Sequence, residues 1–238
     1  MLSDSRIKQI KELLKLLGIK SKNYQLINQA LTHSSYIFEN NINNIQDYER
    51  LEFLGDSVLK IHTSKYLYDK FPDYNEGELT KIRAYLVSDN FISKLALDIS
   101  LEEYINLGIQ EEKTGGRKRK SILACAFEAL LGAFYEDKIF NETYTLLDSL
   151  YSKYIDEIEK NIKFYNAKAL LQEYTQAKSK ELPEYIVKKE SGKAHDKSYE
   201  IEVKYKNIIM GKGSGKSKKE AEQNAAMSAV KKLGLVKE

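Results

Sequence analysis

The stretch YERLEFLGDSVLK, residues 48–60, has the apolar spacing of an amphipathic α-helix. At about 100° per residue, Glu49, Glu52 and Asp56 fall within an arc of ~60° on one face. Its apolar side chains lie on the opposite face: Leu51, Leu54 and Val58. The plain interpretation is a solvated acidic surface. With no interleaved lysine partner at i+4, however, three like charges repel one another, which favours a bound cation.

A second stretch, SILACAFEALLGAFY at residues 121–135, contains a single charged residue, Glu128. Its other side chains are apolar on nearly every face, so this helix is predicted to be buried. A buried lone carboxylate must be paired, protonated or bound to a metal. A structural ion pair with Arg50 or Arg83 is one explanation, and a site for a hard divalent cation such as Mg²⁺ is the other. Glu76 could add a further acid, although its place at a helix N-terminus explains its charge equally well.

Helical periodicity dominates the first 150 residues, which predicts a mainly α-helical domain. The expected helices are Ser3–Leu17, Tyr24–Leu31, Tyr48–Lys70, Gly77–Val87, Asp89–Asp98, Lys120–Tyr135 and Asn141–Lys160.

The pattern changes near residue 162. A helix is expected over Ala167–Lys178, followed by a strand around Tyr185–Val187 and a strand of alternating polarity over Tyr199–Tyr205. A third short strand over Asn207–Met210 ends in the glycine-rich segment 211–215. The residues SKKE at 217–220 then have the form of a capping box that opens an Ala-rich helix to Leu233. The order α-β-β-β-α predicts a small α+β domain.

Composition excludes several classes of protein. The 238 residues are 42% hydrophobic and 31% charged, so the chain can bury a core. No apolar run approaches the roughly 18 residues that span a bilayer, so we expect no membrane segment. The single cysteine, Cys125, excludes an internal disulfide and a Cys-based zinc cluster, which favours a reducing cytoplasm. Residues 164–238 hold 16 Lys against 10 acidic residues, a net +6, while residues 1–163 carry −3, so the C-terminal part is predicted to bind a polyanion.

Five motifs together resemble the bacterial ribonuclease III endonucleases. They are ERLEFLGDSVL (49–59), ALTHSS (30–35), NEGELTKIRAYLV (75–87), GGR (115–117) and SILACAFEALLGAFYED (121–137). The resemblance continues through the C-terminal domain. It implies a dimerising endonuclease domain over residues 1–157, a linker over 158–164 and a double-stranded RNA-binding domain over 165–236.

The resemblance also implies the residues of the nuclease site. By this resemblance the metal positions are Glu52, Asp56, position 125 and Glu128, and Glu49 and Glu76 help to assemble the site. The expected catalytic residues are therefore Glu49, Asp56, Glu76 and Glu128. At position 125 the family has Asp, whereas this chain has Cys125. A thiol suits Mg²⁺ poorly, and nearby carboxylates raise its pKa. Three hypotheses follow: weakened activity, a preference shifted towards Mn²⁺, or RNA binding without cleavage. A deliberately inactivated protein, or a small thiol that only packs between helices, is compatible with them.

A lysine cluster, Lys216, Lys218 and Lys219, lies at the predicted start of the last helix, where free N–H groups favour phosphate. A solvated basic surface is the simpler alternative. The segment resembles the hallmark of double-stranded RNA-binding domains, which implies that the cluster spans phosphates between two minor grooves. The groove contacts implied by the resemblance are Gln172, Glu173, Gly192, Lys193 and His195.

The sequence therefore predicts a dimeric endoribonuclease that hydrolyses double-stranded RNA with Mg²⁺, or Mn²⁺ as a substitute. By resemblance it processes rRNA and mRNA precursors in the cytoplasm and leaves 5′-phosphates and 3′-hydroxyls with short 3′ overhangs. The alternative is a double-stranded RNA-binding protein silenced by Cys125. A protein-interaction dimer that ignores RNA is a third hypothesis, and it conflicts with the +6 segment.

Overall fold

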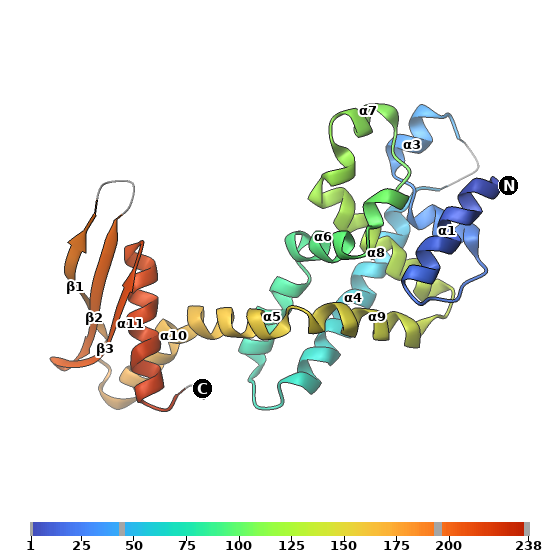
Figure 1. The fold of residues 1–238 in the computed structure, drawn as a ribbon. Helices are drawn as coiled ribbons and strands as arrows, with labels where there is room; N and C mark the ends of the chain where they lie inside the picture. Colours follow the sequence, from blue (N-terminus) through green and yellow to red (C-terminus); the bar gives the residue numbers. More distant parts are fainter. Residues whose placement is uncertain (1, 43–45, 193–196, 236–238) are drawn as a thin grey trace. The chain divides into compact units, whose positions relative to one another are not determined.

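The computed structural model describes residues 2–42, 46–192 and 197–235 (Figure 1). The chain forms two compact units, unit 1 (Met1–Tyr154) and unit 2 (Ile155–Glu238). The predicted fold class, a mainly α-helical domain followed by a small α-β-β-β-α domain, is confirmed.

Unit 1 is built from helices in the part of the chain described. They are α1 (Asp4–Leu16), α2 (Tyr24–Ala30), α3 (Ser34–Glu39), α4 (Glu49–Lys70), α5 (Glu76–Leu86), α6 (Asp89–Asp98), α7 (Ile109–Lys113), α8 (Lys120–Glu136) and α9 (Phe140–Ser152), with 3₁₀ turns η1 (Leu101–Tyr104) and η2 (Gly116–Lys118). The short helices α3 and α7 are not evident from periodicity. The Glu39 carboxylate accepts from the N–H groups of Ile109 and Gln110, so α7 is held at its first turn by a residue of α3.

Helices α4 and α8 cross at two glycines and form the centre of unit 1. A Cβ on Gly55 would lie 1.7 Å from the carbonyl oxygen of Glu128, and one on Gly132 would lie 2.1 Å from that of Leu51. The two backbones are therefore in direct contact, and only glycine permits this at either position. Around the crossing, α8 buries Phe127, and Leu59 of α4 is fully buried. The acidic face of α4 is thereby placed beside Glu128.

Unit 2 consists of α10 (Ile155–Ser179), the strands β1 (Glu184–Ser191), β2 (Ser198–Tyr205) and β3 (Ile208–Gly215), and α11 (Lys218–Lys232). The strands form an antiparallel sheet in the order β1-β2-β3, and α11 packs along it (Figure 1). Ile201 and Val203 of β2 are buried against α10 and α11. The predicted alternation with Glu200, Glu202 and Lys204 is only partly reflected in burial, because Glu202 is buried as well, with Lys212 Nζ 2.8 Å from its carboxylate. The core also contains Ala167, Leu171, Ala221, Ala225, Ala226, Ala229 and Val230.

Strand β3 is longer than predicted, because the glycine-rich segment 211–215 belongs to it. Gly211 and Gly213 face α11: a Cβ on Gly211 would lie 2.3 Å from the carbonyl oxygen of Ala225, and one on Gly213 would lie 2.1 Å from the amide nitrogen of Ala225. The glycines therefore let helix and sheet approach closely and do not form a loop.

The predicted linker, residues 158–164, lies inside α10, which runs unbroken from Ile155 to Ser179. No Gly or Pro interrupts this stretch, so nothing in it ends a helix. The helix expected over 141–160 is instead divided between α9 and α10, although no Gly or Pro marks that break either.

Candidate active site

Four carboxylates gather where α4 and α8 cross. Glu49, Glu52 and Asp56 of α4 and Glu128 of α8 line an open pocket of about 470 Å³, together with Phe53. The predicted juxtaposition of the acidic face with Glu128 is therefore present. It follows from the contact between Gly55 and Gly132, because no side chain separates the helices there.

The environment of Glu128 raises the pKa of its carboxyl to about 8. Burial is the largest cause, and the negative charges of Asp56, Glu52 and Asp89 add to it. Among the described residues no ion pair joins Glu128 to Arg50 or Arg83, and Arg83 donates instead to Ser64 Oγ at 3.1 Å. The structural ion pair considered for Glu128 is thus absent from the described part of the chain.

Cys125 lies three residues before Glu128 on α8 and is half-buried. Burial, a hydrogen bond with Glu52 and the charges of Glu52, Glu128 and Asp89 raise the pKa of its thiol to about 12. The thiol is therefore protonated at neutral pH and carries no charge towards the pocket. At position 125 this chain therefore presents a neutral group beside Glu52 and Glu128.

Asp56 has a lysine partner, contrary to the expectation of an unpaired acidic face. Lys60 Nζ lies 2.7 Å from Asp56 Oδ2, one helical turn further along α4. The spacing is i,i+4, so the lysine was visible in the sequence at the end of the motif.

Asp89, the first residue of α6, is a further acid at this site that the sequence pattern does not single out. Its charge raises the pKa of both Cys125 and Glu128. The start of α6 is held beside the start of α8, since Lys120 Nζ donates to Asn90 Oδ1 at 2.8 Å. An acid in the first turn of a helix is so common that it carries no signal by itself.

Glu76 does not lie among the residues that line the pocket. It is the first residue of α5, where Asn75 and Glu78 form a capping box. Within one chain the structure therefore gives Glu76 the helix N-terminal position that accounts for its charge.

The chemistry of the pocket partly fits a divalent cation. Glu52, Asp56 and Glu128 offer the oxygen ligands that Mg²⁺ prefers, and their position in one pocket concentrates acidic groups that a cation would offset. Cys125 does not fit, because Mg²⁺ binds thiols poorly. Across the described residues, no group of three or more His, Cys, Asp or Glu side chains is arranged to hold a metal ion.

The RNA-binding residues predicted in unit 2 lie on exposed surfaces where the structure describes them. Gln172 and Glu173 are exposed on α10, and Gly192 follows β1 with φ +96°. Lys193 and His195 lie outside the described residues.

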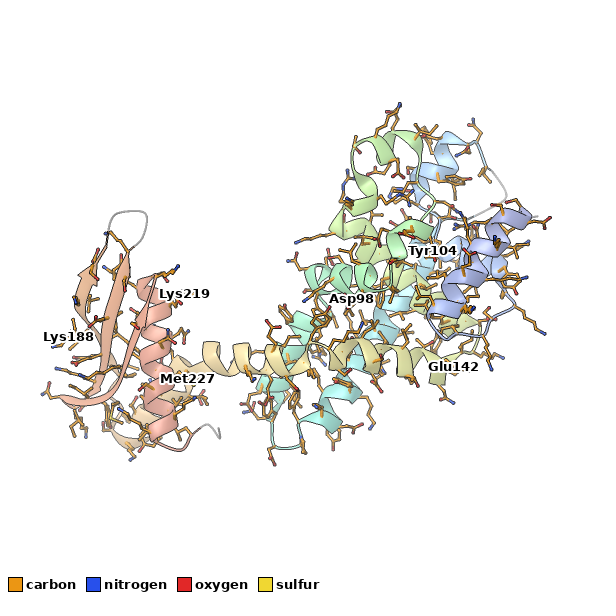
Figure 2. The ribbon with its side chains drawn as sticks, in the orientation of Figure 1. Asp98, Tyr104, Glu142, Lys188, Lys219 and Met227 are labelled. Carbon is orange, nitrogen blue, oxygen red and sulfur yellow. The ribbon has the colours of Figure 1, made fainter. Side chains whose placement is uncertain are left out.

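The lysine cluster surrounds the start of α11, and Figure 2 shows Lys219 at that end of the helix. Ser217 Oγ accepts from the N–H of Glu220 at 3.2 Å, as the capping box predicts. The Glu220 carboxylate accepts instead from the N–H of Lys216 at 2.8 Å, one residue earlier than expected. These bonds fix the backbone that carries Lys216, Lys218 and Lys219, all of which are exposed.

Comparison with known proteins matches both units. Residues 23–155 match the family model described as Ribonuclease-III-like, and residues 167–233 match the double-stranded RNA binding motif. The chain belongs to the ribonuclease III family. It is 41% identical over 225 residues to Ribonuclease 3 of Listeria monocytogenes, covering 94% of this chain and 98% of that protein. It is 44% identical over 227 residues to Ribonuclease 3 of Natranaerobius thermophilus, covering 95% and 97%.

A solved structure of the ribonuclease III family also resembles this chain. The nuclease domain of ribonuclease III from Campylobacter jejuni, described as flexible in a region involved in dimer formation, is 36% identical with a TM-score of 0.55 and covers 60% of this chain and 96% of its own. Family membership and the two matched domains support an endoribonuclease activity on double-stranded RNA. No helix in the described ranges is long and apolar enough to cross a membrane.

Proposed function

We propose that this member of the ribonuclease III family hydrolyses double-stranded RNA with a divalent metal ion, Mg²⁺ or Mn²⁺. The observation that carries the proposal is the pocket at the crossing of α4 and α8, where four carboxylates meet. Glu52, Asp56 and Glu128 would hold the ion. When bound, it would lower the pKa of an attacking water and offset charge on the leaving oxygen.

The residues of the chain supply position and charge. Backbone contact between Gly55 and Gly132 fixes the acidic face of α4 against Glu128, so the donors come from two rigid helices. Glu49 extends the negative surface by one turn of α4. We assign Glu76 an assisting role only in a dimer, since it does not line the pocket of its own chain.

We propose that the protein is a homodimer. Phe53 supports this, because it lies beside the acidic pocket on α4 and is 80% exposed, which is unusual for a phenylalanine without a covering partner. Two sites across a dimer would cut both strands and leave 5′-phosphates and 3′-hydroxyls with short 3′ overhangs. A monomer mass by sedimentation at micromolar concentration would overturn this part of the proposal.

Unit 2 is proposed to hold the duplex. The lysine cluster at the start of α11 would contact phosphates, while Gln172, Glu173 and the segment after Gly192 (Lys193 and His195 in it) would face minor grooves. Such contacts read the shape of A-form RNA, which suits rRNA and mRNA precursors in the cytoplasm as substrates.

RNA binding is tested by its dependence on salt. Replacing Lys216, Lys218 and Lys219 by alanine removes up to three phosphate contacts, so the slope of log K against log salt should fall by about one unit per lysine. A matched control replaces Lys231 and Lys232 at the other end of α11, and we expect its slope to stay that of the unaltered chain. Equal slopes for both variants would place the RNA elsewhere.

A second candidate function follows from Cys125. Because its thiol is neutral with a pKa of about 12, one charged donor is missing from the site. A chain in which this loss is decisive would bind double-stranded RNA without cutting it.

Cleavage of a long RNA duplex with Mg²⁺ and with Mn²⁺ separates the two functions, using the unaltered chain, Cys125→Asp and the control Cys125→Ala. We expect the unaltered chain and Cys125→Ala to cut slowly and Cys125→Asp to cut faster, because a carboxylate is restored. If only Cys125→Asp cuts while all three bind, the chain is an RNA-binding protein. If none cuts although all bind, the proposed nuclease site is wrong.

A further inference from the structure

Lys60 is bound to one of the proposed metal donors. Its Nζ lies 2.7 Å from Asp56 Oδ2, and the two side chains are 54% and 35% exposed. Lys60 is therefore a lysine of α4 that pairs directly with a carboxylate of this pocket.

A lysine and a divalent cation compete for the same oxygen. An ammonium group donates to carboxylate lone pairs, and a metal ion needs those lone pairs free. In this structure Asp56 Oδ2 accepts a hydrogen bond from Lys60 Nζ. Metal binding that uses Asp56 must therefore displace the lysine or share the carboxylate with it.

The net charge of the site determines how strongly it attracts a cation. The pocket is lined by the acidic side chains of Glu49, Glu52, Asp56 and Glu128. Lys60 places a positive charge against one of them, Asp56, within the chain itself. The attraction for a cation is lowered accordingly.

We propose that Lys60 is an internal counter-ion that competes with the divalent cation for Asp56 and so sets the metal affinity of the site. The inference rests on the proposed metal-dependent function. Lys60 is a positioning residue: in the metal-free protein it holds the Asp56 carboxylate, and it raises the metal concentration at which that carboxylate is released.

The test measures Mn²⁺ binding directly, by electron paramagnetic resonance of the free ion, on the full chain without RNA. Lys60→Met keeps the aliphatic stem and removes the charge, so we expect the dissociation constant for Mn²⁺ to fall about two- to fivefold, the scale of a partly exposed ion pair. Lys60→Arg keeps the charge and should bind Mn²⁺ as the unaltered chain does.

Helix α4 offers a matched control in a second i,i+4 pair, Lys65 with Asp69 at 2.5 Å. This pair lies outside the acidic pocket, so Lys65→Met should leave Mn²⁺ affinity unchanged while removing a similar exposed pair. Circular dichroism confirms that each variant is folded before binding is measured.

The outcomes separate the inference from the function on which it rests. Saturable Mn²⁺ binding that tightens in Lys60→Met alone supports the competition. Saturable binding that is unchanged or weaker in Lys60→Met, or that tightens equally in Lys65→Met, overturns the inference and leaves the metal site standing. No saturable binding to any variant overturns the proposed metal site and the inference with it.

Discussion

Replacing Gly55 with alanine should push apart the two helices that carry the site. The added Cβ would lie 1.7 Å from the carbonyl oxygen of Glu128, 2.5 Å from its carbonyl carbon and 2.9 Å from the amide nitrogen of Gly132. Ordinary contact begins near 3.4 Å, so the shortfall is about 1.7 Å. All three atoms belong to the backbone of α8 and cannot rotate away.

The magnitude follows from overpacking. Forcing an extra methyl group into a packed core costs about 1–3 kcal/mol, and a clash with the backbone of the facing helix belongs at the upper end. For a chain of this size that corresponds to a fall in the melting temperature of roughly 6–12 °C. Separation of the helices also moves Glu52 and Asp56 away from Glu128, and a displacement of ~1 Å can cost a hundredfold in rate.

Thermal unfolding followed by circular dichroism, and RNA cleavage below the transition, measure the two effects. Gly77→Ala is the control, because it is also a helical glycine and its Cβ would meet only the Asn75 side chain, at 3.3 Å. It should stay within about 1 kcal/mol of the unaltered chain, since alanine favours a helix. If Gly55→Ala melts as Gly77→Ala does, the two helices are not in backbone contact and the account of how the site is assembled is wrong.

Three further predictions concern single interactions. Because the pKa of Glu128 is raised, the folded, metal-free chain holds a proton between pH ~4.5 and ~8 that the unfolded chain releases, so stability should fall as pH rises through this range. We expect the urea midpoints at pH 5 and pH 8.5 to differ less in Glu128→Gln than in the unaltered chain. An equal fall in the variant and the unaltered chain would contradict the burial of this carboxyl. Arg117 donates to the Glu112 carboxylate through its Nε at 2.8 Å and to the backbone carbonyl of Ile105 through another nitrogen of its guanidinium group. Arg117→Lys should therefore lower the free energy of unfolding by about 1–3 kcal/mol in denaturant titrations. An unchanged midpoint would show that the planar guanidinium group is not needed. Lys168 Nζ lies 2.6 Å from the Glu222 carboxylate, so Glu222→Gln should lower the free energy of unfolding by roughly 0.5–1 kcal/mol at low salt and by nothing measurable in 1 M NaCl. A loss of stability that persists at high salt would not be electrostatic.

The sequence is informative about this fold wherever one face of an element is much more polar than the other. The helix over residues 48–70 and the strand over Tyr199–Tyr205 are both present in the structure, because burial of one face selects the period. Burial in that strand does not follow the alternation throughout, since Glu202 on the polar face is buried too. The segment 211–215 shows the limit. Glycine is compatible with a loop and with a strand pressed against a helix, and only the position of α11 decides between them.

The acids of the site were predictable for the same reason, and their partners were not. Glu49, Glu52 and Asp56 share a face by spacing alone, and Glu128 is conspicuous as a charge in an apolar helix. Whether Lys60 turns towards Asp56 depends on a side-chain rotamer that helical spacing permits but does not require. Asp89 acts on Glu128 only because α6 packs against α8, and its own sequence neighbourhood carries no trace of that contact.

The contact between β3 and α11 also bears on how this domain can change. In most cores a larger side chain at one position can be accommodated by a smaller one at its neighbour, so destabilising substitutions have second-site suppressors. Gly211 and Gly213 face the backbone of α11 at Ala225, where there is no side chain left to shorten. A substitution at either glycine has no compensating partner within reach and is reversed only by restoring glycine. Mutation can therefore abolish the close approach of sheet and helix, and with it the placement of the lysine cluster at the start of α11. It cannot change that distance in small steps.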